Sequence, residues 1–416
     1  MRDAEVERTL ARIANPVFRA AGLNPASVHV YIVNDRELNA FVAGGQNIFL
    51  FTGLLARLET IDQLRAVIAH ETGHITGGHQ ARRDQAMKGA RGMALIGMIG
   101  AAAATAGGSP TAGLAIASSS RQAAERSMLA HNRAEEASAD TAGIRYMISA
   151  GVDPAAMEEV LDIFRGQEAL SASRQDPYLL THPLTRERLR AVRALIAGHE
   201  GAEADARAQY WFDRMNGKLT AFLRAPSWTL RRVGTSDTSE IARLRRAIAY
   251  HRNADETRAM AEVDALVALR PSDPFYHELR GQILYESRRY VEAVAAYARA
   301  VELAPREPLI LAGYGRALLA SDTVSGNRQA LEVLNRARAR DPFNPRLLRD
   351  LALAHARLDQ TGLASVTTAE RYALIGRFDD AVIHANRATG LLPQGSPGWL
   401  RAQDVLGVAQ TALNRR

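Results

Sequence analysis

The 416-residue sequence contains no cysteine, and this absence limits its chemistry. It excludes a disulfide framework, a thiolate metal site and a cysteine nucleophile. Histidine and carboxylate side chains therefore remain as the ligands of any metal site. The absence does not identify a compartment, because proteins outside the cytoplasm also occur without cysteine.

Lysine is almost absent as well. Lys88 and Lys218 are the only lysines among 52 basic residues, so the net charge of +7 comes from arginine. The arginines are scattered among 45 acidic residues, and no basic run is interleaved with aromatic residues. The pattern indicates a solvated, arginine-rich surface rather than a nucleic-acid-binding protein.

No apolar run is long enough to span a membrane. The most apolar stretch, residues 89–120, is broken at Gly107–Pro110 into halves that are each shorter than the ~20 residues a spanning helix needs. We expect two short helices packed as a hairpin, with a membrane-touching or mobile flap as the alternative. The polar N-terminus shows no signal peptide, so we expect a cytoplasmic protein or one whose targeting segment has been removed.

The central motif is His70-Glu71-Thr72-Gly73-His74, which reads H-E-x-x-H. On a helix, residues i and i+4 share one face, so the two histidines can hold one zinc ion. Glu71 beside them can then act as a general base on water. A capping box at Thr60–Gln63 and an apolar stripe of Leu64, Val67 and Ile68 predict a buried helix here.

Glycines 73, 77 and 78 within this predicted helix suggest the close approach of another backbone, such as the 89–120 stretch. His79 lies five residues after His74. We expect it to face elsewhere, about 140° around the helix, and to have a structural role.

The elements around the motif are predicted from periodicity. An amphipathic helix over residues 1–23 precedes three short strands, and helices follow the motif. The predicted strands cover residues 28–33, 39–43 and 47–51, and the later helices cover 121–150, 153–170 and a segment opened by the loop at 180–185. An edge strand beside the motif helix could pair with an extended substrate, or the sheet could simply pack.

From about residue 240 the sequence repeats with a period near 34. Ala247, Gly281 and Gly315 are each 34 residues apart, and Pro271 and Pro305 follow the same step. This spacing is typical of tetratricopeptide repeats, which are paired helices that stack on one another.

A third metal ligand is needed beside the two histidines. The segment Glu136-Ala137-Ser138-Ala139-Asp140 has the form E-x-x-A-D. Here the sequence resembles the HtpX-like, Oma-type and CAAX-processing metalloendopeptidases. That resemblance implies that Glu136, rather than its neighbour Glu135, is the third ligand, and that Asp140 supports the site by hydrogen bonding.

The order of the motifs, followed by Thr181-His182-Pro183, Arg188 and the repeats, resembles that of BepA-like periplasmic zinc metalloproteases. The resemblance implies that His182 can act as a fourth ligand, a latch that holds the enzyme inactive. The alternative is a turn histidine. The resemblance also places Arg188 in the active-site region as a candidate oxyanion donor, with a surface arginine as the alternative.

The sequence therefore predicts a mainly α fold with a small β-sheet. We expect a gluzincin-type zinc peptidase domain (1–200), bridging helices (201–239) and a tetratricopeptide-repeat solenoid (240–416). By resemblance the protein is a periplasmic zinc endopeptidase that acts on misfolded or stalled envelope proteins and contacts the outer-membrane protein assembly machinery. No nucleic-acid partner is expected, and peripheral membrane contact is the open alternative noted for residues 89–120. The alternative function is a chaperone or adaptor with latent protease activity.

Overall fold

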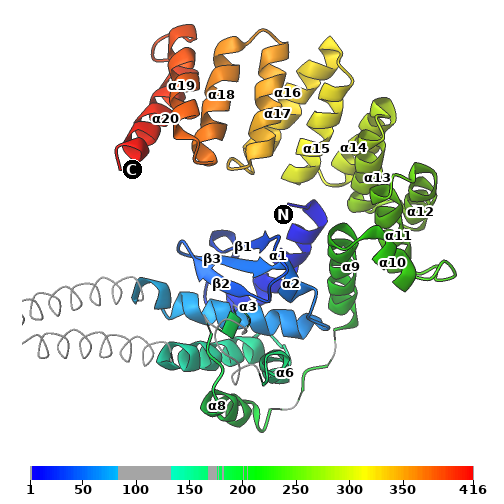
Figure 1. The fold of residues 1–416 in the computed structure, drawn as a ribbon, viewed down its shortest axis with the longest axis vertical. Coiled ribbons are helices and arrows are strands. Elements are labelled where there is room, and N and C mark those ends of the chain that lie inside the picture. Colours follow the sequence, from blue (N-terminus) through cyan, green and yellow to red (C-terminus); the bar gives the residue numbers. More distant parts are fainter. Residues whose placement is uncertain are drawn as a thin grey trace, which may run out of the picture. The chain divides into compact units, whose positions relative to one another are not determined.

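The computed structural model describes residues 2–82, 133–166, 176, 178–179, 182–199, 201–203 and 205–415 (Figure 1). The chain divides into two compact units, Val6–Leu219 and Thr220–Arg416, and Arg2–Glu5 group with the second. The predicted hairpin or flap at 89–120 lies outside the described residues. The predicted limits of the peptidase domain, the bridge and the repeat domain stay predictions.

The first unit combines helices with one small sheet. Its elements in chain order are α1 (Ala4–Ala20), a 3-10 turn (Pro25–Ser27), β1 (His29–Val33), β2 (Ala40–Ala43), β3 (Asn47–Phe51), α2 (Thr52–Leu55), α3 (Ile61–Thr76), a helix over residues 133–149, α6 (Ala155–Ile163), α8 (Arg186–Ile196) and α9 (Ala206–Leu223). The three predicted strands are confirmed.

The sheet has the order β1-β3-β2. β1 runs parallel to β3, with Val30 opposite Ile48, and β2 runs antiparallel to it, with Val42 opposite Ile48. The turn from β2 to β3 uses Gly44 and Gly45, which both have positive φ angles that glycine adopts without steric cost. β2 is therefore an edge strand, and α3 packs against it.

α3 begins at the predicted capping box. The Thr60 side chain accepts a hydrogen bond from the backbone of Gln63, whose side chain bonds back to the Thr60 backbone. Leu64, Val67 and Ile68 are buried, as the apolar stripe predicts. The helix ends at Thr76, where Gly78 turns the chain with a φ of +62°.

Two glycines let the helix over residues 133–149 cross α3 with the backbones in contact. A Cβ atom on Gly73 would lie 2.6 Å from the Ala139 carbonyl oxygen, and one on Gly143 would lie 3.1 Å from the Ala69 carbonyl carbon. The close approach expected at Gly73 is confirmed, and the partner is this helix.

α6 is shorter than the predicted helix at 153–170. It ends at Ile163, and Gly166 follows with a φ of +88°. Glycine in this left-handed conformation commonly terminates a helix, which accounts for the difference.

The second unit is a stack of paired helices (Figure 1). They are α10 (Pro226–Arg232), α11 (Glu240–Arg252), α12 (Glu256–Leu269), α13 (Pro274–Glu286), α14 (Tyr290–Leu303), α15 (Pro308–Ala320), α16 (Val324–Arg338), α17 (Pro345–Arg357), α18 (Thr361–Leu374), α19 (Phe378–Leu391) and α20 (Pro397–Leu413). The prediction of helical repeats is confirmed.

The 34-residue period has a packing cause. A Cβ on Gly281 would lie 2.7 Å from the Tyr297 ring, and one on Gly315 would lie 2.5 Å from Leu334. The glycines therefore allow the two helices of a pair to approach closely. Among the described residues, no helix is long and apolar enough to cross a lipid bilayer.

We predict that Gly73→Ala destabilises the first unit by about 1–3 kcal/mol, because the added methyl group overlaps the Ala139 backbone. Urea unfolding of the full chain measures the change. Gly407→Ala is the control, since that helical glycine has open space around it and the change should be neutral or stabilise by up to about 1 kcal/mol. Equal stability of Gly73→Ala and the parent would contradict the close-contact interpretation.

Candidate metal centre

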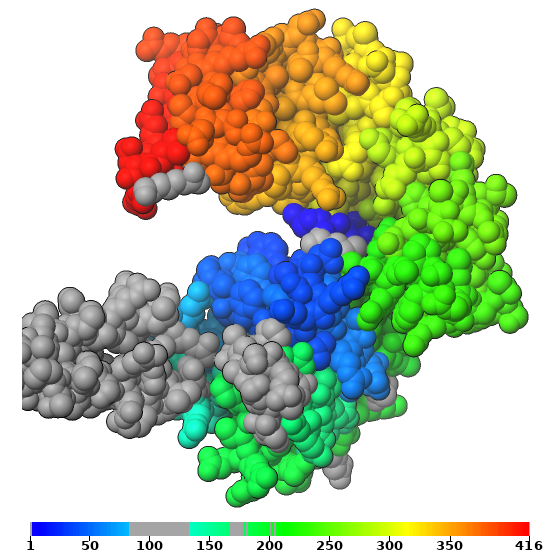
Figure 2. All heavy atoms as spheres, in the orientation of Figure 1, coloured from blue at the N-terminus to red at the C-terminus, as the bar shows by residue number. Residues whose placement is uncertain are grey.

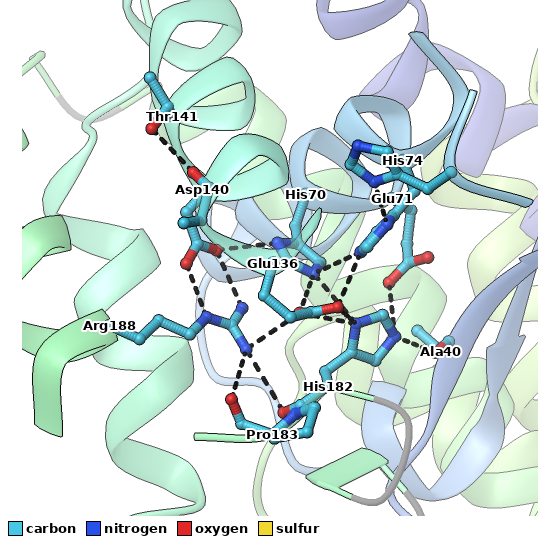
Figure 3. Close-up of polar contacts among 12 residues, drawn as sticks. Ala40, His70, Glu71, His74, Glu136, Asp140, Thr141, His182, Pro183 and Arg188 are labelled. Atoms are coloured by element: carbon cyan, nitrogen blue, oxygen red, sulfur yellow. Dashed lines mark hydrogen bonds and ion pairs between the residues drawn. The ribbon is translucent and has the colours of Figure 1, made fainter. Parts of the chain in front are cut away.

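The two motif histidines lie on the buried face of α3. The His70 and His74 Nε2 atoms are 3.1 Å apart, and their side chains are 1% and 5% exposed. Both rings thus present one nitrogen to the same point, as the i, i+4 spacing predicts (Figure 3).

The neighbouring helix brings a carboxylate to this point. Glu136 Oε2 lies 3.3 Å from His70 Nε2, and Oε1 lies 3.4 Å from His74 Nε2. Glu136 lies one turn before Ala139, whose backbone touches Gly73. The close crossing of the two helices therefore sets the distance between the carboxylate and the histidines. Glu135 instead lies 3.8 Å from Arg82.

His182 reaches the same point from the loop before α8. Its Nδ1 lies 3.1 Å from His70 Nε2 and 3.1 Å from Glu136 Oε2. On its other side, Nε2 lies 3.3 Å from the Ala40 carbonyl oxygen at the start of β2. The Tyr178 ring packs against His182 at 4.6 Å between ring centroids.

These side chains form a group that can hold a metal ion. His70, His74, Glu136 and His182 each offer one ligand atom, and the four atoms lie within 4.8 Å of one another. All four residues are buried. Three imidazoles and one carboxylate, with no thiolate, suit a transition-metal ion such as zinc.

The electrostatics of the group also favour a cation at its centre. Burial opposes charge on Glu136, but the neighbouring His182 and His70 rings outweigh it and hold the pKa of Glu136 well below its usual range. Burial and the charges on His70 and His182 lower the pKa of His74. A buried carboxylate that stays ionised beside a neutral imidazole is a suitable environment for a metal ion.

Asp140 and Arg188 support the group from outside. Asp140 Oδ1 lies 2.9 Å from His70 Nδ1, so Nδ1 donates its proton to this carboxylate and Nε2 is the nitrogen that faces the centre. Burial would lower the pKa of His70, but hydrogen bonds and charges from Asp140 and Glu136 outweigh it and raise that pKa to about 9.

Arg188 links both acids and the His182 loop. Its Nε donates to Asp140 Oδ2 at 2.6 Å, and its Nη1 lies 3.0 Å from Glu136 Oε2. Nη1 also donates to the His182 carbonyl oxygen at 3.3 Å. Burial would raise the pKa of Asp140, but Arg188 and His70 outweigh it and lower that pKa to about 2. The guanidinium is 5% exposed and holds other residues in place.

Glu71 lies next to the centre without belonging to it. Its side chain is fully buried, and among the described residues neither carboxylate oxygen has a hydrogen-bond partner. Oε1 lies 3.5 Å from His182 Nε2. A buried, ionisable carboxylate with both oxygens available can act as a base toward a small molecule at the centre.

The orientation predicted for His79 is wrong. Its Nδ1 lies 2.7 Å from His74 Nδ1, and the ring is buried. The angular argument assumed that α3 continues as far as His79, but the helix ends at Thr76 and the turn at Gly78 brings the ring back. The Gly77-Gly78 pair was the sequence signal for this turn. His79 can thus fix the tautomer of His74, as Asp140 does for His70.

The structure brings together every residue that the sequence suggested for the site, which are His70, Glu71, His74, Glu136, Asp140, His182 and Arg188 (Figure 3). Their individual roles stay predictions. Sequence reasoning missed His79 as a neighbour of His74. It also missed Tyr178, which packs between Phe164 and His182 and had no local signal.

We predict that Asp140→Asn weakens zinc binding roughly 10–100-fold, because the amide cannot share the His70 proton as a carboxylate does. Competition with a chromophoric chelator measures the affinity. Thr141→Ala is the control, since Thr141 is exposed on the same helix and, among the described residues, its hydroxyl bonds only the Ala137 carbonyl. An unchanged affinity in Asp140→Asn would remove Asp140 from the supporting contacts.

Comparison with known proteins gives matches to both parts of the chain. Residues 1–196 match peptidase family M48, and residues 274–307 match the tetratricopeptide repeat. The beta-barrel assembly-enhancing protease of Escherichia coli (strain K12) is 27% identical over 379 residues, which cover 88% of this chain and 75% of that protein.

Two further relatives agree with this match. The beta-barrel assembly-enhancing protease of Yersinia pestis is 26% identical over 381 residues, covering 88% of this chain and 76% of that protein. The mitochondrial metalloendopeptidase OMA1 of Schizosaccharomyces pombe is 26% identical over 186 residues, covering 44% and 51%. Together with the buried histidine–glutamate group, these matches identify the chain as a metalloprotease with a peptidase M48 domain and tetratricopeptide repeats, homologous to the beta-barrel assembly-enhancing proteases.

Proposed function

We propose that this metalloprotease is a zinc-dependent endopeptidase in which His70, His74 and Glu136 hold the metal. The observation that carries the proposal is the convergence of these ligand atoms within 4.8 Å, beside the fully buried Glu71 carboxylate. When bound, zinc supplies Lewis-acid chemistry that activates water and polarises a carbonyl group.

The chain's own residues perform the proton transfers. Glu71 accepts the proton of the attacking water and then delivers it to the leaving amine. Its two oxygens make no hydrogen bond within the described residues, so they are available for this exchange. The edge strand β2 lies beside α3 and can align an extended substrate through backbone pairing.

Arg188 serves this reaction mainly by positioning other groups. Its contacts to Asp140 and Glu136 hold one carboxylate behind His70 and another at the metal. The expectation that Arg188 donates to the oxyanion stays a prediction. In that role, an Arg188 N–H group that now contacts Asp140 or Glu136 would have to turn toward the oxyanion.

His182 acts as a latch in this proposal. Its Nδ1 faces the centre at 3.1 Å from His70 Nε2, where it can occupy the position that water and substrate need. The enzyme becomes active when the loop that carries His182 moves away. Contacts from Tyr178 and Arg188 stabilise the closed position of that loop.

The substrates that we propose are misfolded or stalled envelope proteins in the periplasm, with the repeats binding substrates or the outer-membrane protein assembly machinery. The resemblance to beta-barrel assembly-enhancing proteases and the repeat unit support this placement. The second candidate function is a chaperone or adaptor whose protease activity is latent. The observation that favours this second function is the inward position of His182, which can keep the protease inactive.

We predict that Glu71→Gln lowers kcat for casein or an unfolded porin by roughly 10²–10⁴-fold, since the amide cannot accept the proton of water. Zinc content should not change. Glu187→Gln, an exposed glutamate at the start of α8, is the control. If Glu71→Gln still cleaves at the parent rate, the proposed mechanism fails. If it loses cleavage but fully complements a deletion strain, the chaperone or adaptor function is primary.

We predict that His182→Ala raises the peptidase rate on the order of tenfold, which corresponds to a closed state favoured by about 1.4 kcal/mol. His199→Ala, at an exposed histidine after α8, should leave the rate unchanged. Steady-state cleavage of a fluorogenic peptide measures both, with zinc content determined in parallel. A rate that stays equal to the parent's, at full zinc occupancy, would rule out the latch.

A further inference from the structure

Positive charge is concentrated in a short part of the repeat unit. Residues 220–252 contain seven arginines and only two acidic residues, so they carry +5 of the chain's net +7. The arginines are Arg224, Arg231, Arg232, Arg243, Arg245, Arg246 and Arg252. Arg224 directly follows α9, and the others lie in α10 and α11, which pack side by side (Figure 1).

Three of these arginines have structural partners. Arg243 and Arg246 form ion pairs with Glu262 at 3.2 and 2.6 Å. Arg252 donates to the Ala221 carbonyl oxygen at 3.0 Å and also to that of Arg224. Their charges therefore serve to hold α9, α11 and α12 in place.

The other four have no ion pair and no side-chain hydrogen bond among the described residues. They are Arg224, Arg231, Arg232 and Arg245. The first three are exposed, and Arg245 is partly buried with an Nε atom that is shielded from solvent and has no hydrogen-bond partner. Burial and the nearby charge of Arg232 lower the pKa of Arg245, so the group lacks a compensating anion.

Trp228 holds two of these arginines in a defined arrangement. The guanidinium of Arg232 lies over its ring at 4.6 Å from the centroid, and that of Arg224 at 5.5 Å. Stacking uses the face of a guanidinium and leaves the N–H groups at its edge free. Those donors match the oxygen atoms of a phosphate group.

We propose that this surface, the α10 patch of Arg224, Trp228, Arg231, Arg232 and Arg245, binds the phosphate headgroups of an anionic lipid membrane. The patch needs several negative charges close together, which a lipid surface presents in two dimensions. Tryptophan with arginine is also a common composition at a membrane–water interface. The residues around the patch, green in Figure 2, form part of the visible surface of the repeat unit.

An acidic protein segment is the other ligand with complementary charge. It would offer its carboxylates along a line, whereas the four arginines lie just after α9, in α10 and in α11. The lipid surface is therefore the occupant that the patch fits better, and the acidic segment becomes an outcome of the test.

The test is flotation of the full chain with vesicles of phosphatidylcholine alone or with added phosphatidylglycerol. We expect binding to the anionic vesicles only, and its loss at high salt. Arg231→Ala/Arg232→Ala should weaken binding about 30-fold, taking about 1 kcal/mol for each arginine. Arg328→Ala/Arg387→Ala is the matched control, since it removes from α16 and α19 two exposed arginines that form no ion pair within the described part of the chain.

Three results would overturn the proposal. They are equal binding to both kinds of vesicle, no binding to either, and equal weakening by the patch and control variants. Binding of a polyglutamate peptide through Arg231 and Arg232, without vesicle binding, would identify the patch as a protein interface instead. If the patch variant cleaves casein at the parent rate, its loss of vesicle binding does not come from damage to the proposed active site.

Tryptophan fluorescence places the contact independently. The chain has three tryptophans, so Trp211→Phe/Trp399→Phe leaves Trp228 as the single reporter. We expect its emission to shift when anionic vesicles are added, because the headgroups cover the two arginines stacked on it. Vesicle binding without a shift would place the contact elsewhere on the chain and reject the α10 patch.

Discussion

The metal centre depends on the contact between the backbones of α3 and the helix over residues 133–149. Because Gly73 has no side chain, the Ala139 backbone can lie against α3. One turn before this contact, Glu136 reaches between His70 and His74, and immediately after it Asp140 reaches the far nitrogen of His70. One helix crossing thus places both a candidate ligand and the acid that orients another ligand.

This arrangement buries the charges of Asp140, Glu136 and Arg188, which compensate one another. Asp140 and Glu136 both contact the Arg188 guanidinium, which also bonds the loop that carries His182. Buried ion pairs add little net stability, because desolvation offsets most of the attraction. Their value here is geometric: the arginine couples the two acids to the loop, so their positions are interdependent. A buried network with fixed positions suits a candidate site for a cation, because it keeps the ligand atoms in place.

Local pattern was sufficient to predict much of this protein from sequence. The strands, the capped helix from Ile61 and the 34-residue repeat each follow from short-range periodicity and are present in the structure. The prediction for His79 failed where the regular geometry of a helix ends. His79 was placed by helical rotation, yet α3 ends at Thr76 and a glycine turn reverses the chain. The α10 patch was not predicted, because its arginines are spread over residues 224–245 and form no continuous run in the sequence.

The position of His182 connects the candidate metal centre to the edge strand β2, which we propose to pair with the substrate. The Tyr178 backbone N–H donates to the Leu38 carbonyl oxygen at 3.2 Å, and His182 Nε2 lies 3.3 Å from the Ala40 carbonyl oxygen. Residues i and i+2 of an extended chain present their carbonyls to the same side. Tyr178 and His182 therefore cover the acceptors at the start of β2, while the His182 ring also faces His70. One ring makes both contacts, so withdrawal of His182 from the centre must also release Ala40. In the proposed latch, access for water and access for a substrate backbone are therefore coupled.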